Sequence, residues 1–201
     1  MSASPVDAAV IGAGSWGTAL AHLLDRNGHG VRLWSFEKEV TRAIINTREN
    51  PTYLPGVRLS PAVRVSSRLE ETVTGANWIV SVSPSQFVAD VMGEAAPFIG
   101  EDSVVVSASK GIEISTLRRM DEVLSEALPE PIARRLVVLS GPSFAVEVAR
   151  GQPTAVVAAS ASRDARLEAQ RIFSSPSFRV YTNPDVIGVE LGGALKNVIA
   201  L

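Results

Sequence analysis

The strongest constraint on the fold is a regular alternation of short apolar runs with longer amphipathic segments. The apolar runs are rich in valine, which is typical of buried strands. They lie at 6–11, 30–34, 78–82, 103–107, 136–140, 154–159 and 178–181, with a weaker one near 62–66, and helical patterns lie at 15–26, 37–46, 85–95, 115–128, 143–150 and 162–173. Strand, helix and strand repeated in this way predict an α/β fold with a parallel sheet covered on both faces.

A glycine-rich turn joins the first predicted strand to the first predicted helix. Residues 12–17 read Gly-Ala-Gly-Ser-Trp-Gly, a G-x-G-x-x-G motif that follows the apolar run and opens the helical pattern. Gly12 permits a tight turn, Gly14 lets the backbone approach a pyrophosphate, and Gly17 lets the helix pack on the strand. The helix N-terminus adds free N–H groups and a positive dipole. This placement predicts dinucleotide binding by a Rossmann-type, doubly wound, mainly parallel sheet.

An acidic residue lies where ribose recognition is expected. Glu37 comes 20 residues after Gly17, just past the apolar run 30–34. A carboxylate there accepts hydrogen bonds from ribose hydroxyls and repels a 2′-phosphate, which favours NAD. Lys38 and Arg42 are close enough to leave NADP open, and Glu37 can equally be a first-turn helix acid stabilised by the dipole.

The segment 47–61 interrupts the alternation. It contains Asn50-Pro51, Pro55-Gly56 and Pro61, which are typical turn residues. We therefore expect a loop or a pair of turns there.

Composition argues against several classes of function. The chain has 201 residues, of which 46% are hydrophobic and 20% charged, which is normal for a globular fold. Its net charge is −2 with scattered Lys and Arg, so we expect no nucleic-acid partner. No window approaches 18 apolar residues, and 1–5 lack a basic stretch, so we expect no membrane span, no signal peptide and a cytoplasmic location. Without cysteine, and with only His22 and His29, we expect no metal site.

Lysine is rare in this chain, with three residues against 16 arginines. Lys110 follows the Val-rich run 103–107 on a turn beside Gly111. That turn belongs to the sheet edge where ligands bind in open α/β folds. Lys110 alone is also consistent with an exposed turn lysine.

Two further turns are expected at the same edge. The segment 81–87 ends a strand at Pro84 and places Phe87 in the first turn of a helix. The segment 139–148 breaks at Gly141-Pro142, and proline suits the first position of the helix that follows. Backbone N–H groups at that turn could bind a hydroxyl or a phosphate, although an ordinary turn is the alternative.

The last segment, 186–201, is apolar nearly all round and follows Asp185, a suitable N-cap. We expect a buried helix that belongs to a longer chain, because no stop signal appears, and self-association through it if the chain is alone. Within this helix Lys196 leans back over Gly192 and Gly193, which clear space for a small substrate or another backbone. Such a lysine suits proton transfer, or else it extends to solvent.

Taken together, these segments resemble the NAD(P)-dependent glycerol-3-phosphate dehydrogenase family. The matching motifs are VIGAGSWGTALA, NPTYLPG, SKGIE, SGPSFAVEVARG and GVELGGALKNVIAL, which cover nearly the whole chain in the expected order. LWSFEKEV with INTRENPTYLPG is similar to the eukaryotic NAD-dependent branch, and SGPSFA to the bacterial branch. The resemblance implies hydride transfer with NAD or NADP between glycerol 3-phosphate and dihydroxyacetone phosphate, and a supply of glycerol 3-phosphate for phospholipid synthesis.

The resemblance also implies a role for each matching residue. Lys196 is implied as the general acid–base, and Lys110 as the cation between nicotinamide and substrate that stabilises developing charge. Together with Gly14 and Glu37, the expected cofactor contacts are Gly12, Ser15, Trp16, Gly17, Phe36, Phe87, Lys110 and Ala145; the expected substrate contacts are Lys110, Gly141, Ser143 and Lys196.

Chains of this family continue into a helical domain that supplies an Arg-Asn pair and an acidic residue for the substrate. We therefore expect 1–184 to be the cofactor domain and 185–201 to be the first helix of an all-helical C-terminal domain. The chain alone is then expected to be weakly active or inactive. The sequence is also compatible with a homodimer. Two alternative functions are compatible with it as well, a related hydroxyacid or ketopantoate-type reductase and a non-catalytic dinucleotide-binding module.

Overall fold

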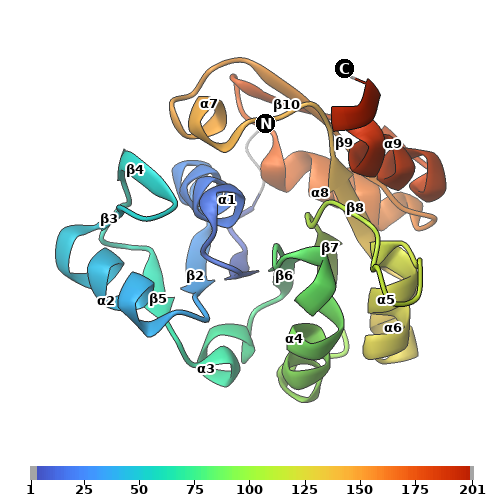
Figure 1. Ribbon diagram of the computed structural model, residues 1–201, viewed down its shortest axis with the longest axis horizontal. Helices are drawn as coiled ribbons and strands as arrows, with labels where there is room; N and C mark the ends of the chain where they lie inside the picture. The colour runs from blue at the N-terminus through green and yellow to red at the C-terminus, as the bar shows by residue number, and fades with distance from the viewer. Residues whose placement is uncertain (1–3, 200–201) are drawn as a thin grey trace.

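The computed structural model describes residues 4–199, with side chains described from 4 to 196. Its centre is an eight-stranded sheet in the order β10-β9-β8-β7-β6-β1-β2-β5 (Figure 1). The strands are β1 (Asp7–Ile11), β2 (Gly30–Trp34), β5 (Arg64–Ser66), β6 (Trp78–Ser81), β7 (Val104–Ser107), β8 (Val137–Ser140), β9 (Thr154–Ala159) and β10 (Phe178–Asn183). The order reverses between β1 and β6, which makes the sheet doubly wound as predicted.

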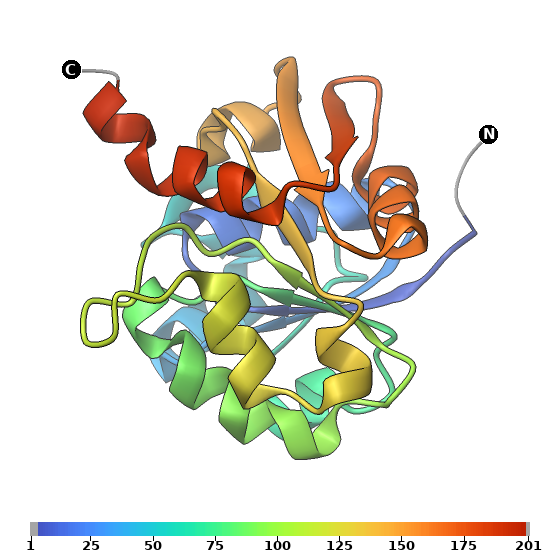
Figure 2. The ribbon, with the colours of Figure 1, turned by 90° about the vertical axis from the view of Figure 1, so that its right-hand side faces the viewer.

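Helices cover both faces of the sheet because the strands are apolar on both sides. In β1, Ala8 and Val10 pack into one core cluster and Ala9 and Ile11 into the other. The first cluster includes residues of α1 (Ser15–Arg26), α2 (Lys38–Thr47) and α8 (Arg163–Phe173). The second includes residues of α3 (Leu69–Val73), α4 (Val88–Ala95), α5 (Met120–Ala127) and α6 (Glu130–Ala133). Figure 2 shows α4, α5 and α6 below the sheet, in green to yellow.

Strand direction departs from the repeated strand–helix–strand pattern at β9. This strand pairs antiparallel with β8, and β10 pairs parallel with β9, so the last two strands run against the other six. The cause is α7 (Ala145–Ala149), which is one short turn of helix packed against α1 rather than a crossover helix on the sheet (Figure 1). The sheet is therefore mainly parallel, as predicted, although the repeated strand–helix–strand pattern does not continue through its end.

Several local predictions need correction. The segment 47–61 is not only loop, because β3 (Glu49–Asn50) and β4 (Leu54–Arg58) form a two-stranded antiparallel hairpin. The helix expected at 115–128 begins only at Met120, and Leu117 in the preceding loop has a φ of 59°.

Other differences concern short helices. The helix expected at 85–95 starts with a turn of 3-10 helix, η1 (Ser85–Phe87), and a second such turn, η2 (Ala96–Phe98), follows α4. Neither α3 nor α6 was expected, because a helix of one turn leaves too little periodicity to detect.

The final helix, α9 (Val186–Ile199), begins where predicted, and Oδ1 of Asp185 accepts the Gly188 N–H at 2.9 Å as its cap. The helix packs against β8 and β9 and lies above the sheet in Figure 2. Its exposed side chains include Ile187, Leu191 and Leu195, so this chain alone does not bury the helix, and its burial in a longer chain stays a prediction. The expected continuation to residue 201, and part of the expectation for 1–5, lie outside the described residues.

Candidate functional site

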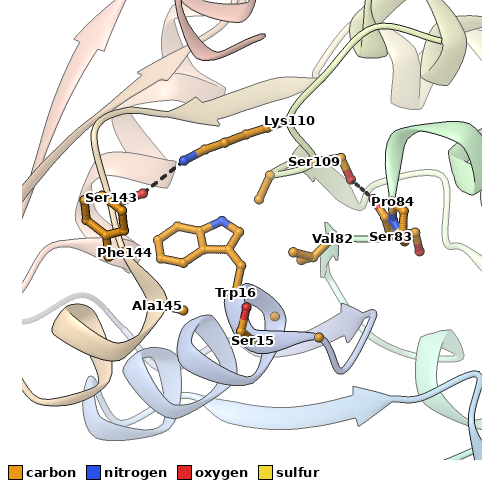
Figure 3. Close-up of a pocket in the computed structure, with 13 residues that line it drawn as sticks. Ser15, Trp16, Val82, Ser83, Pro84, Ser109, Lys110, Ser143, Phe144 and Ala145 are labelled. Atoms are coloured by element: carbon orange, nitrogen blue, oxygen red, sulfur yellow. Dashed lines mark hydrogen bonds between the residues drawn. The ribbon is translucent and has the colours of Figure 1, made fainter. Parts of the chain in front are cut away.

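A pocket of about 400 Å³ lies at the carboxyl edge of the sheet, where the strand order reverses. Open α/β sheets bind ligands at this place. Four connections meet there, those that follow β1, β6, β7 and β8. The lining residues are Gly14, Ser15, Trp16, Gly17, Val82, Ser83, Pro84, Ala108, Ser109, Lys110, Ser143, Phe144 and Ala145 (Figure 3).

The glycine loop needs its first and third glycines for backbone geometry. Gly12 has a φ of 123°, which side chains rarely adopt, and a Cβ there would meet the Val82 carbonyl oxygen at 2.9 Å. A Cβ on Gly17 would lie 1.8 Å from the carbonyl oxygen of Gly12. The loop therefore folds back closely on the start of α1, as the motif predicts.

The second glycine leaves open space instead. Gly14 is the N-cap of α1, and no atom lies within 4 Å of where its Cβ would be. No side chain caps this helix start, so its first N–H groups point toward the pocket edge without a side-chain acceptor. The indole Nε1 of Trp16 is also buried without a hydrogen-bond partner. An anion that occupies the open space beside Gly14 and accepts hydrogen bonds fits the start of α1. The pyrophosphate of a dinucleotide is such an anion.

Lys110 reaches across the pocket from the end of β7. Its Nζ donates to the carbonyl oxygen of Gly141 at 3.1 Å and to Oγ of Ser143 at 3.3 Å. It also lies 5.5 Å from the ring centroid of Trp16, and Figure 3 shows the side chain extended above the indole. Burial, and secondly repulsion from Lys196, lower the pKa of Lys110 to about 8.

Lys196 approaches the same pocket from α9. Its Nζ lies 5.0 Å from the ring centroid of Phe144, which lines the pocket. The helix can come this close because a Cβ on Gly193 would lie only 2.3 Å from Oγ of Ser140, at the end of β8. Gly192 faces open space. Gly193 thus allows close packing on the Ser140 side chain, and the space beside Gly192 stays a predicted place for a substrate.

The predicted ribose region lies outside the pocket lining, at the end of β2. Glu37 is the N-cap of α2, and its carboxylate oxygen Oε1 accepts a 2.9 Å hydrogen bond from the Tyr53 hydroxyl. That bond raises the pKa of Tyr53. Phe36 is 81% exposed and packs edge-on against Trp34, with ring centroids 6.3 Å apart.

The structure thus brings most of the expected residues together. Seven of them line the pocket: Gly14, Ser15, Trp16, Gly17, Lys110, Ser143 and Ala145. Gly12 underlies it, Gly141 contributes a carbonyl oxygen to Lys110, and Lys196 contacts a lining ring. Phe36, Glu37 and Phe87 are not among the lining residues, and Phe87 is 58% exposed in η1.

Some residues of this region were missed from the sequence. Oγ of Ser109 donates to the Ser83 carbonyl oxygen at 2.6 Å and so ties the connection after β7 to the one after β6 (Figure 3). The fully buried Asn50 donates to the Ala13 carbonyl oxygen at 2.8 Å and to Oγ1 of Thr18 at 2.9 Å. Serines after strands give no pattern, and the residues just before Asn50 in the sequence are polar, so nothing local signals that its side chain is buried.

The described part of the chain offers neither a metal site nor a membrane-spanning helix. Among its residues, no three or more His, Asp or Glu side chains are placed to hold a metal ion. None of its helices combines the length and the apolar character needed to cross a lipid bilayer.

Comparison with known proteins points to one family. The model of the NAD-dependent glycerol-3-phosphate dehydrogenase N-terminus matches residues 7–166. A Geobacter sulfurreducens protein named glycerol-3-phosphate dehydrogenase, NAD(P)+, is 54% identical over 192 residues, which are 96% of this chain and 57% of that protein. A Moorella thermoacetica protein of the same name is 49% identical over 193 residues, 96% of this chain and 56% of that protein.

Solved structures agree with this match. A crystal structure of glycerol-3-phosphate dehydrogenase from Coxiella burnetii superposes with a TM-score of 0.89 at 35% identity, covering 98% of this chain and 59% of that one. A ketopantoate reductase from Ralstonia eutropha is similar at a TM-score of 0.68 and 20% identity, over 92% of this chain and 58% of that one, and shows the fold alone. The chain spans just over half the length of the curated relatives that it matches.

Proposed function

Because the chain belongs to the NAD-dependent glycerol-3-phosphate dehydrogenase family, we propose that it is the dinucleotide-binding part of an enzyme that interconverts glycerol 3-phosphate and dihydroxyacetone phosphate. The observation that carries the proposal is the convergence of Lys110 and Lys196 at a pocket lined by the glycine loop. Negative charge on a phosphorylated substrate is stabilised by nearby cations, and here Lys110 lines the pocket while Lys196 lies beside the lining ring of Phe144.

The cofactor is proposed to be NAD or NADP, held by its pyrophosphate at the start of α1. Gly14 and Ser15 lie where backbone N–H groups are free, and Gly12 and Gly17 shape the turn. Trp16 and Ala145 then flank the pocket beside the phosphates. When bound, the cofactor supplies or accepts the hydride.

The proposed adenosine end lies beyond the pocket. Phe36 offers an exposed aromatic face, and Glu37 offers a carboxylate oxygen for the ribose hydroxyls. Glu37 favours NAD for this reason. Phe87 is proposed to contact the cofactor from η1 on the other side of the loop.

The chain's own residues are proposed to handle charge and protons at the substrate. Lys196 gives a proton to the C2 oxygen of dihydroxyacetone phosphate, or takes it from the C2 hydroxyl of glycerol 3-phosphate. Lys110 stabilises negative charge at that oxygen, because the Lys110 amine is partly desolvated and is oriented by its hydrogen bonds to Gly141 and Ser143. Ser143 and the turn at Gly141 bind the substrate together with the two lysines.

The proposal also covers the domain organisation, the partners and the location of the protein. Residues 1–184 are proposed to form the cofactor domain and 185–201 to begin a helical substrate domain, which is consistent with the greater length of the relatives. Small metabolites are the proposed partners, with no nucleic acid among them. A cytoplasmic location suits water-soluble phosphorylated substrates. The exposed apolar side chains of α9 are proposed to pack against further protein, either more of a longer chain or a second copy.

The first test is a titration of this chain with NADH and NADPH, followed by protein fluorescence, because Trp16 lines the pocket. Binding with a preference for NADH supports both the site and the role of Glu37. A preference for NADPH overturns the role of Glu37 and points to Lys38 or Arg42. Binding of neither overturns the cofactor site as a property of this chain.

The second test uses the longer enzyme that contains this chain. Lys196→Ala should abolish reduction of dihydroxyacetone phosphate while leaving NADH affinity nearly unchanged. If affinity and turnover fall together, the proton-transfer role is wrong. Turnover of 2-keto acids in place of dihydroxyacetone phosphate would assign the enzyme to a different reductase class.

A further inference from the structure

Glu190 is a buried carboxyl group that the proposed mechanism does not use. It lies on α9, and its side chain is 7% exposed. Its two carboxyl oxygens face the backbone N–H of Asp121 at 3.0 and 3.3 Å, and Oε2 lies 3.6 Å from Nε of Arg119. Asp121 is in the first turn of α5, where N–H groups have no partner within the helix. A side chain of α9 therefore supplies the acceptor for the start of α5.

A second contact holds the same helix at the sheet. Gly193 lies against Ser140, so closely that a Cβ on Gly193 would be 2.3 Å from the Ser140 Oγ. Positions 190, 193 and 196 follow each other at three-residue spacing, which puts neighbours on one side of a helix. Glu190 and Gly193 thus fix α9 at two points, and Lys196 is the next position along.

We propose that Glu190 is a positioning residue, which docks α9 on the start of α5 and thereby sets where the Lys196 amine lies at the pocket. The inference rests on the proposed role of Lys196. It adds a residue from outside the pocket, about one and a half helical turns away from the lysine. The chemistry required of Glu190 is only hydrogen bonding, and it contacts neither cofactor nor substrate.

The charge state of the cluster is consistent with a docking role. Burial, and secondly a hydrogen bond between the carboxyl groups of Glu190 and Asp121, raise the pKa of Glu190 to about 9. Burial acts to raise the pKa of Asp121, but hydrogen bonds with the side chains of Glu190 and Arg119 outweigh it and hold that pKa below its usual range. Glu190 is then the uncharged member of the pair, so that α9 docks without burying a second negative charge. An uncharged side chain with a carbonyl oxygen should serve nearly as well.

The test compares two substitutions of equal size in the longer enzyme. Glu190→Gln keeps an acceptor for the Asp121 N–H, and Glu190→Met fills the same space without one. With Glu190→Met, kcat for dihydroxyacetone phosphate should fall on the order of ten- to a hundredfold, as for a reacting group displaced by about 1 Å. The dissociation constant of NADH should stay unchanged, and Glu190→Gln should keep most of kcat.

Glu122→Met is the matched control. Glu122 pairs with the same Arg119 at 3.3 Å and accepts the Arg119 N–H at 2.9 Å, but belongs to α5 and does not link it to α9. This variant should lower the thermal midpoint with kcat retained. Asp121→Pro deletes the N–H from the other side of the contact, in the first turn of α5, where that N–H has no partner within the helix, and should reproduce the loss of kcat if Glu190→Met fails to fold.

The outcomes distinguish failure of the positioning role from failure of the proposed function. Absence of turnover in the unchanged enzyme would refute the proposed function itself. If the unchanged enzyme is active and Glu190→Met keeps its kcat, the positioning role is wrong. The same holds if Glu190→Gln loses as much kcat as Glu190→Met, or if NADH affinity falls in parallel.

Discussion

The hydroxyl of Tyr53 donates a 2.9 Å hydrogen bond to the carboxylate of Glu37. Tyr53 lies between β3 and β4, and Glu37 lies at the end of β2, so the bond joins the hairpin to the proposed ribose site. The hairpin is in turn held to the glycine loop, because Asn50 donates to the Ala13 carbonyl oxygen. One small hairpin therefore fixes the relative positions of two parts of the proposed cofactor site.

Tyr53→Phe should weaken NADH binding by about two- to tenfold, the effect of losing one hydrogen bond of about 0.5–1.5 kcal/mol. The Glu37 carboxylate loses the group that orients it, whereas NADPH affinity should change less, because Glu37 does not favour a 2′-phosphate. Fluorescence titration with both cofactors measures the ratio. Tyr181→Phe, on the exposed face of β10, is the control and should leave both affinities alone. Equal weakening for both cofactors would argue against orientation of Glu37.

Two glycines of the loop should respond differently to alanine. Gly17→Ala places a Cβ against the Gly12 carbonyl and should destabilise the fold by about 1–3 kcal/mol or more. Gly14→Ala has open space and should change stability by less than about 0.5 kcal/mol. It should nonetheless cost most of the NADH affinity, since the methyl group occupies the proposed pyrophosphate position. Urea unfolding and NADH titration of both variants decide this, and undiminished NADH binding by Gly14→Ala would move the pyrophosphate elsewhere.

Lys110 should make stability depend on pH in the alkaline range. Its pKa is lowered to about 8 in the folded chain, so above that value the unfolded chain holds more protons. Folding stability gains from this residue as pH rises through about 8 toward the unfolded pKa of about 10.4. Lys110→Met should therefore raise the free energy of unfolding most near neutral pH. The difference in that free energy between the variant and the unchanged chain should shrink toward pH 10.

Urea unfolding at a series of pH values measures that difference. Lys38→Met, at the exposed start of α2, serves as the lysine control. A difference for Lys110→Met that stays constant with pH would show that the desolvation of Lys110 is not linked to folding.

Asn50→Ala should lower the free energy of unfolding by about 1–3 kcal/mol, because it removes buried hydrogen bonds to Ala13 and Thr18. NADH affinity should fall as well, since the hairpin is no longer tied to the glycine loop. Asn27→Ala removes hydrogen bonds to the end of α8 and is the matched control for stability. Loss of stability in both variants with loss of affinity only in Asn50→Ala is the expected result.

The strands, the long helices and the glycine loop could be predicted from the sequence, because they depend on hydrophobic periodicity and on the positions of glycines. Seven strands and the long helices lie close to their expected ranges, because apolar runs and amphipathic patterns are local signals. The glycine loop was predictable because Gly12 and Gly17 answer steric demands of the turn itself.

Strand direction and side-chain networks were not predictable in the same way. An apolar run has the same pattern whether its strand is parallel or antiparallel to its neighbour. Nothing in 154–159 therefore predicts that β9 pairs antiparallel with β8. The hairpin 49–58 depends on the buried amide of Asn50, which reaches partners 32 and 37 residues away. The convergence of Lys110 and Lys196 was expected from family motifs, whereas the contact of Glu190 with α5 has no local pattern at all.

The reversal at β9 has a consequence for how this architecture can vary. A crossover connection must span the sheet, and its length is fixed by that distance. Between β8 and β9 the chain turns back at the edge where it left, so residues 141–153 stay on the pocket side throughout. Insertions or deletions in that stretch can reshape the wall formed by Ser143, Phe144 and Ala145 without altering strand register. A change of length in this return loop, outside the part of α7 that packs against α1, can thus alter the proposed pocket while the pairing of β8 with β9 is kept.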